Sequence, residues 1–375
     1  MSTDFRRKFV DLQASTAPLR EELLAACRRV IDSGWFLRGP ETEAFERELA
    51  RSCGAEYAVA VSNGLDALRL TLRAWKLSGK LSDGDEVIVA ANTYVASVLA
   101  ITDAGLKPRL VEPDGLTHNL SAESVGKALS ARTRAIMEVH LYGLPCPHTE
   151  IEKIAAGNDL LIIEDNAQAI GASVQGRHTG ALGTAAAFSF YPTKNVGALG
   201  DAGAVTTSCR ELADAVRALA NYGSDRRYHN IYAGFNCRMD EMQAAMLRVK
   251  LRYLRQETAA RDAVARAYSG TISNQLVIKP IVPNGHTHVW HQYVIRTRHR
   301  EQLRTYLLSH GIPTDIHYAT PPHLQPCYQG VFTGNYPLAE RLAREVVSLP
   351  IAGLTPDEAK EIALIINSFT PVKGK

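Results

Sequence analysis

The sequence predicts an α/β fold, with a large domain built on a mainly parallel seven-stranded sheet and a smaller α+β domain. Three observations predict it: short apolar segments that alternate with helical stretches, one long helix after them, and a change of pattern beyond that helix. Because strands that alternate with helices form βαβ units, most of these segments should run parallel. The segments span residues 57–62, 86–91, 107–112, 134–140, 160–164, 186–191 and 203–208.

The long helix is indicated by apolar residues that recur at steps of three and four. These residues form one apolar face and predict a single helix from Met239 to about Tyr268. A helix of this length can leave a large domain and lead into a second one. The residues on this face are Met239, Met242, Met246, Val249 and Tyr253.

The pattern beyond the long helix is that of a small α+β unit. Apolar segments at 277–278 and 289–295 precede a helix near 301–310, and a closing helix is expected from Pro356 to Phe369. We therefore place the domain boundary near residue 255, with the large domain at 1–255 and the small domain at 256–375.

Composition and charge narrow the class of protein. The chain has 375 residues, 46% of them hydrophobic and 22% charged, which is ordinary for a globular protein. A net charge of +3, from 42 basic and 39 acidic residues, is too small to indicate nucleic acid as the main partner. Basic pairs such as Arg226-Arg227 are nevertheless suited to a phosphorylated small molecule.

Targeting signals are not readable in the sequence. No apolar run approaches the ~18 residues of a transmembrane helix, and the charged amino terminus lacks the apolar core of a signal peptide. The six cysteines are scattered without a Cys-x-x-Cys pair. We therefore expect reduced thiols, a cytoplasmic location and no membrane partner.

A lysine, an aspartate and a serine follow two of the predicted strands. Asp165 ends an apolar strand, and Ser189 and Lys194 follow another. Open α/β sheets bind ligands at the carboxyl ends of their strands. An amine, a carboxylate and a hydroxyl at this edge are suited to pyridoxal phosphate: the lysine forms a Schiff base, the aspartate pairs with the ring nitrogen, and the hydroxyl binds the phosphate.

The motifs around these residues are similar to those of a known family. Glu164-Asp165-Asn166-Ala167-Gln168-Ala169, Ser189-Phe190-Tyr191-Pro192-Thr193-Lys194-Asn195 and Gly200 to Val205 resemble the DegT/DnrJ/EryC1/StrS sugar aminotransferases, and the resemblance runs over nearly the whole chain. It implies the fold-type I aminotransferase architecture, in which an amino-terminal segment packs on the small domain. It also implies pyridoxal phosphate as cofactor, with Lys194 and Asp165 as the catalytic residues.

Further cofactor contacts are expected around the helix that begins near Leu65. A glycine at a helix start lets a phosphate approach the free amides, so Gly64 and Leu65 are candidates. Many relatives have Thr or Ser where Leu65 stands, which shifts more of the phosphate binding to Ser189. The resemblance implies that Tyr94 stacks on the ring and that Gln168 contacts the ring hydroxyl.

The segment from Gly234 to Glu241 concerns the expected oligomeric state of the protein. It resembles the family segment that crosses a dimer interface, which implies that Asn236 binds the phosphate in the partner subunit of a homodimer. The alternative is that Asn236 caps the long helix of its own chain.

The expected substrate also follows from the resemblance. The segments around Trp290-His291 and from Ile316 to Leu324 resemble enzymes that aminate the 3-keto carbon of dTDP-deoxysugars, with L-glutamate as donor. Gly200-Asp201-Ala202 points the same way, since many 4-keto enzymes have a Gly-Glu-Gly run there. The implied substrate-binding residues are Tyr191, His291, His317, Tyr318 and His323.

Several alternatives remain open. A 4-keto enzyme is one, and the nucleotide could be UDP or GDP. A pyridoxal-phosphate-dependent sugar dehydratase is another, although relatives of that kind have histidine in place of Lys194. A non-catalytic regulatory relative is the third. No metal site is expected, because the histidines at 286, 288 and 291 have no acidic ligand close in sequence.

Overall fold

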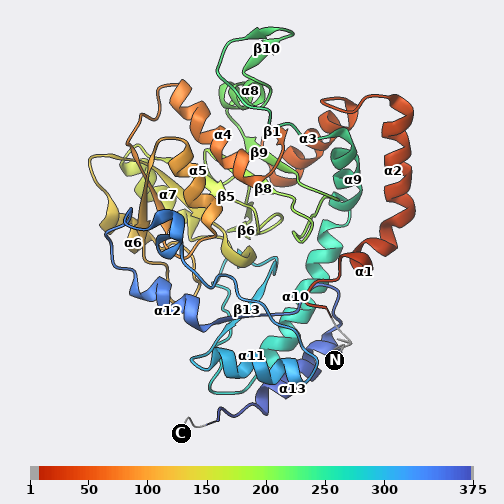
Figure 1. The fold of residues 1–375 in the computed structure, drawn as a ribbon, viewed down its shortest axis with the longest axis vertical. Helices are drawn as coiled ribbons and strands as arrows, with labels where there is room; N and C mark the ends of the chain where they lie inside the picture. Colours follow the sequence, from red (N-terminus) through yellow and green to blue (C-terminus); the bar gives the residue numbers. More distant parts are fainter. Residues whose placement is uncertain (1–7, 373–375) are drawn as a thin grey trace.

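The computed structural model describes residues 8–372, which form a three-layer α/β domain and a smaller domain beside it (Figure 1). The central sheet has seven strands in the order β1-β9-β8-β5-β4-β2-β3. All run parallel except β9, which pairs antiparallel with both of its neighbours. The strands are β1 Tyr57–Val61, β2 Glu86–Ala90, β3 Lys107–Val111, β4 Thr133–Val139, β5 Leu161–Asp165, β8 Ala185–Ser189 and β9 Gly203–Thr207.

The helices lie mainly between the strands in sequence, as the alternation predicts. Those of the first 251 residues are α1 Leu12–Thr16, α2 Arg20–Ser33, α3 Pro40–Cys53, α4 Gly64–Leu77, α5 Val95–Asp103, α6 Ala122–Ala128, α7 His148–Gly157, α8 Arg210–Leu219 and α9 Glu241–Leu251. The later ones are α10 Leu254–Thr271, α11 Arg300–Ser309, α12 Pro337–Glu345 and α13 Pro356–Asn367.

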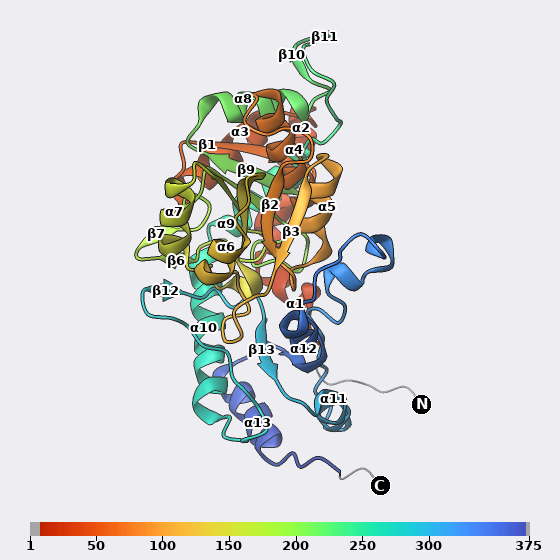
Figure 2. The same cartoon turned by 90° about the vertical axis from the view of Figure 1, so that its left-hand side faces the viewer.

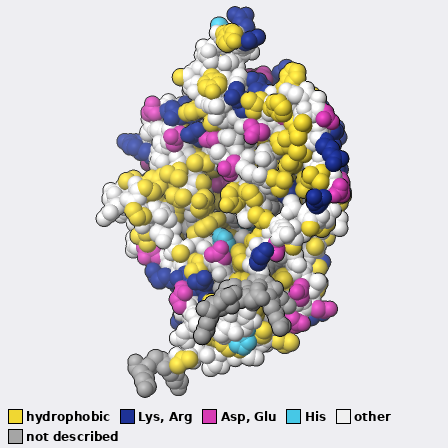
Figure 3. Space-filling model, turned by 45° about the vertical axis from the view of Figure 1, so that its right-hand side comes forward, with side chains coloured by type: hydrophobic (Ala, Val, Ile, Leu, Met, Phe, Trp, Pro, Cys, Tyr) yellow, Lys and Arg dark blue, Asp and Glu magenta, His cyan; other side chains and the backbone are white. Residues whose placement is uncertain are grey.

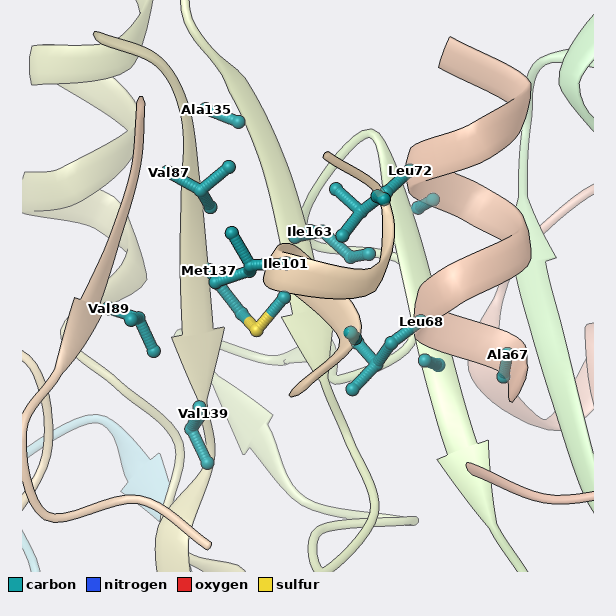
Figure 4. Close-up of a cluster of buried hydrophobic side chains, with 14 of the residues drawn as sticks. Ala67, Leu68, Leu72, Val87, Val89, Ile101, Ala135, Met137, Val139 and Ile163 are labelled. Carbon is teal, nitrogen blue, oxygen red and sulfur yellow. The ribbon is translucent and has the colours of Figure 1, made fainter. Parts of the chain in front are cut away.

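Both faces of the sheet are covered, because consecutive strand residues point to opposite sides. On one face Met137 and Ile163 pack against Leu68 and Leu72 of α4, and α5 adds Ile101 (Figure 4). On the other face the neighbouring residue Ile136 packs among α6 and α7, while α3 and α9 cover the β1–β8 side. Burial on both faces explains why most of these strands are largely apolar, whereas Lys107 and Arg109 of the edge strand β3 are exposed.

The small domain has a separate core. Helices α10, α11 and α13 pack around the antiparallel pair β13 (Tyr293–Arg296) and β14 (Val346–Leu349). Residues between them reach back to the large domain: the Tyr328 hydroxyl bonds Thr102 on α5, and Glu112 accepts the first amides of α12. In the amino-terminal segment, the ring of Phe9 lies on His317 with centroids 6.1 Å apart. The domain boundary itself stays a prediction.

The single long helix predicted from Met239 is wrong: the structure has two helices. Met239 and Asp240 precede α9, and a turn at Arg252 and Tyr253 separates it from α10, with the Tyr253 amide bonded three residues back to Lys250. The apolar face continues across this turn onto α2. Spacing alone therefore could not reveal the break.

Short strand pairs complete the fold outside the central sheet. The hairpin of β10 and β11 projects from the large domain at the end opposite the small domain (Figures 1 and 2). The hairpin consists of β10 Ser224–Arg226 and β11 His229–Asn230. A separate three-stranded sheet has the order β12-β6-β7, with β6 at Ser173–Val174, β7 at Arg177–His178 and β12 at His286–Thr287.

Candidate active site

The sheet brings the predicted aspartate and lysine segments to one edge. Strands β5 and β8 are parallel neighbours with Asp165 opposite Ala187, so their carboxyl ends meet. β8 ends at Ser189, before Phe190 and Tyr191, and a tight turn follows in which the Lys194 amide donates to the Tyr191 carbonyl at 2.8 Å. This turn brings Lys194 back towards the edge where Asp165 ends β5.

The side-chain amine of Lys194 has a lowered pKa. Burial lowers its pKa from the ordinary 10.5 to about 8, against the attraction of the Asp165 carboxylate. Burial also lowers the pKa of His291 and of His317, and the positive charge of Lys194 adds to both shifts. These four side chains therefore form one electrostatic cluster, with both imidazoles held in the neutral form.

The start of α4 forms a cradle beside Ser189. A Cβ atom on Gly64 would lie 2.7 Å from Cβ of Ser189, so only glycine permits this approach. The Asn63 side chain caps the helix by accepting the Asp66 amide at 2.8 Å. Leu65 turns its side chain to the apolar core, which leaves its amide as its only polar group here. Free amides at the start of a 14-residue helix beside a hydroxyl fit a phosphate dianion.

A group of tyrosines adjoins Asp165. The Gln168 side chain donates to the Tyr318 hydroxyl at 2.8 Å and accepts the Tyr142 amide at 2.6 Å. The rings of Tyr318 and Tyr94 lie 5.0 Å apart, and the Tyr142 hydroxyl donates to the His317 carbonyl. The Asp165 carboxylate is among the charges that raise the pKa of Tyr318, after burial. The structure thus brings Gln168, Tyr94, Tyr318 and His317 together.

His291 is held by a residue that the sequence reasoning did not select. The side chain of Asn195 contacts the His291 ring at 3.2 Å and donates to the Val289 carbonyl at 2.8 Å. Asn195 therefore ties the lysine turn to the 289–291 loop. Its position directly after Lys194 within the motif was the available signal.

Three predicted residues lie apart from this cluster. His323 is 3.4 Å from Glu340 and packs on Tyr336, so its contacts are with the α12 region. Tyr191 has 52% of its surface exposed. Asn236 is also exposed and pairs with Asn221. The alternative that Asn236 caps the long helix is wrong, because the residue before α9 is Asp240.

Two large cavities lie away from Lys194 and Asp165. A cavity of about 420 Å³ lies along the outer edge of β1, and one of about 720 Å³ lies beside α10; neither is lined by Lys194 or Asp165. Within residues 8–372, His, Cys, Asp and Glu side chains form no group of three suited to a metal ion. Over the same range, every helix is too short or too polar to span a bilayer.

Comparisons with known proteins show the family of this chain. Residues 18–367 match the model of the DegT/DnrJ/EryC1/StrS aminotransferase family. The dTDP-3-amino-3,6-dideoxy-alpha-D-galactopyranose transaminase of Aneurinibacillus thermoaerophilus is 44% identical, over 96% of this chain and 99% of that protein. The erythromycin biosynthesis sensory transduction protein EryC1 of Saccharopolyspora erythraea is 45% identical, over 94% and 96%.

Among solved structures, the fold is similar to that of S. venezuelae DesV in complex with a ketimine intermediate. The TM-score is 0.92 at 43% identity, with 96% of this chain and 97% of that chain covered. The predicted fold class is thereby confirmed. The chain belongs to the DegT/DnrJ/EryC1/StrS aminotransferase family and is a pyridoxal-phosphate-dependent aminotransferase.

Proposed function

We propose that this enzyme moves an amino group from L-glutamate to C3 of a dTDP-linked 3-keto-6-deoxyhexose. Two similarities support this substrate. The chain is 44% identical to the Aneurinibacillus protein, which is named as a transaminase of a dTDP-3-amino-3,6-dideoxy sugar, and the segments around His291 and at 317–323 resemble those of 3-keto enzymes. A cytoplasmic location remains a prediction.

The observation that carries the catalytic assignment is the position of Lys194 next to Asp165 at the carboxyl ends of β5 and β8, where burial lowers the pKa of its amine. At about 8, this pKa leaves a useful fraction of the amine unprotonated near neutral pH, so Lys194 can both accept and return a proton. A surface lysine at 10.5 would be almost fully protonated at the same pH. The amine beside Asp165 is therefore suited to general acid–base catalysis.

The other residues of the cluster fit pyridoxal phosphate by shape and charge. The cradle of Gly64, Leu65 and Ser189 would hold the phosphate, Tyr94 would cover the ring, and Gln168 would contact its hydroxyl. When bound, the cofactor supplies a ring that accepts electrons from the neighbouring carbon. Asp165 would keep the ring nitrogen protonated, and Lys194 would hold the cofactor and then carry the proton between substrate and cofactor carbons.

We infer that the active enzyme is a homodimer with shared sites. Segment 35–37 lies beside the segment that leads from Asn236 into α9, since the Glu241 amide donates to the Phe36 carbonyl and Leu37 pairs with Asp240. Large apolar side chains of this region are exposed, and Figure 3 shows broad hydrophobic areas on the face that includes α2 and α9. Exposed apolar area of this kind typically marks an interface. The side chains are Ile31, Trp35, Phe36, Leu37, Tyr222, Tyr228 and Ile231.

A product analysis tests the proposed reaction. The enzyme loaded with pyridoxal phosphate and L-glutamate is given dTDP-3-keto-, dTDP-4-keto- and UDP-linked sugars separately, and the position of the new amine is read by NMR. Amination at C3 of the dTDP sugar is expected. A preference for C4 or for UDP would overturn the substrate assignment, and loss of oxygen without amination would favour the dehydratase. If the enzyme turns over none of the amino donors tested, a non-catalytic regulatory role would be favoured.

A further inference from the structure

The Asp165 carboxylate is held by a side chain outside the motifs. Ser97, in the first turn of α5, donates its hydroxyl proton to Oδ2 of Asp165 at 2.7 Å. Oδ1 accepts the Ala167 amide at 3.2 Å. Ser97 is fully buried and Asp165 only 7% exposed, so water cannot readily replace this bond. A carboxylate has about four acceptor positions, so others remain for a ligand.

The hydroxyl of Thr93 contacts Ser97 in turn, and the two hydrogen bonds have a defined donor–acceptor order. Oγ of Ser97 lies 2.7 Å from Oγ1 of Thr93, which is also buried. An ionised carboxylate can only accept, so the single Ser97 proton is committed to Asp165. Thr93 then donates to Ser97 across 2.7 Å, a shorter contact than the 3.2 Å from the same hydroxyl to the Tyr94 carbonyl. The two bonds form a one-way chain from Thr93 through Ser97 to Asp165, in which each bond polarises the next.

We propose that Ser97, supported by Thr93, is a positioning residue that fixes the Asp165 carboxylate for the ring nitrogen of the cofactor. The proposal rests on the role of Asp165 given under the proposed function. Without the Ser97 hydroxyl, Oδ2 loses a buried donor, and the carboxylate can rotate about its Cβ–Cγ bond or admit water. The pairing of Asp165 with the ring nitrogen then weakens. A ring nitrogen that is less fully protonated makes the cofactor a poorer electron acceptor, so the proton transfer by Lys194 should slow.

The test is a pair of substitutions at Ser97 in the holoenzyme. Ser97→Ala should lower kcat about 10- to 100-fold, the scale of one hydrogen bond to a charged group, with KM for the sugar within about twofold. It should also shift the pH midpoint of the visible absorption of the bound cofactor. Ser97→Thr keeps the hydroxyl and should restore both quantities towards wild type. Thr93→Val should have a smaller effect alone and none added to Ser97→Ala, because both act through one bond.

Two controls separate positioning from general damage. Thr206→Val removes another fully buried hydroxyl, which donates to the Gly180 carbonyl, and should leave kcat and the absorption midpoint unchanged. Asp165→Asn is measured in parallel. Wild-type kcat and midpoint in Ser97→Ala, with Asp165→Asn impaired, would refute the positioning role alone. If Asp165→Asn is also unimpaired, the role of Asp165 fails and the proposal falls with it.

Discussion

Burial of Lys194 should lower the free energy of unfolding at neutral pH, and this destabilisation should become smaller as the pH rises. The folded pKa of about 8 lies below the unfolded value of 10.5. The unfolded chain therefore binds more protons between these values, and stability rises with pH through this window. The difference corresponds to about 3 kcal/mol below pH 8, and to about 1 kcal/mol at pH 9.5.

The perturbation is Lys194→Met, which keeps an unbranched side chain one atom shorter and removes the charge. In protein freed of cofactor, the variant should be more stable than wild type at pH 7, and this advantage should shrink by about 2 kcal/mol at pH 9.5. Changes in packing act almost equally at both pH values, so they cancel in the comparison, and the attraction between the Lys194 charge and Asp165 is already contained in the folded pKa of about 8.

The assay is urea unfolding of both proteins at pH 7 and pH 9.5, with Lys153→Met as the control. Lys153 is exposed, so its variant should differ from wild type by the same small amount at both values. If the advantage of Lys194→Met does not change with pH, the amine is not shifted by burial, and the physical basis of its catalytic role is wrong.

Three further predictions concern Asp165, Asn236 and Glu241. Asp165→Asn should still bind pyridoxal phosphate but lose roughly 3–5 kcal/mol of transition-state stabilisation in steady-state kinetics; near wild-type turnover would make the carboxylate purely structural. Mixing Lys194→Ala and Asn236→Ala dimers should restore about half the activity per hybrid, because one of the two shared sites is complete; no recovery after confirmed subunit exchange would refute the shared site. The buried carboxylate of Glu241 accepts the amides of Gly39, Glu41 and Thr42, each at 2.8 Å, at the start of α3. Glu241→Gln should therefore lower the free energy of unfolding by about 2–4 kcal/mol, whereas the exposed Glu43→Gln control should change it little, and equal effects in urea melts would contradict the capping role.

The sequence by itself determined the strands of the central sheet and predicted a site around Lys194. Strands buried on both faces are largely apolar; Asp165 ends one such strand and Lys194 follows another, so local patterns placed both at the carboxyl edge of the sheet. The family motifs carried the cofactor and the fold class. These features are readable because each depends on residues close together in the chain.

Only the tertiary structure decided what depends on contacts between distant segments. The break at Tyr253 was hidden because the apolar face passes across it onto α2. Ser97 meets Asp165 across 68 residues, and Glu241 meets α3 across about 200. The pKa of Lys194 is set by how completely neighbouring elements exclude water from its amine. Burial and long-range hydrogen bonds are properties of the packed chain, so no local pattern could have specified them.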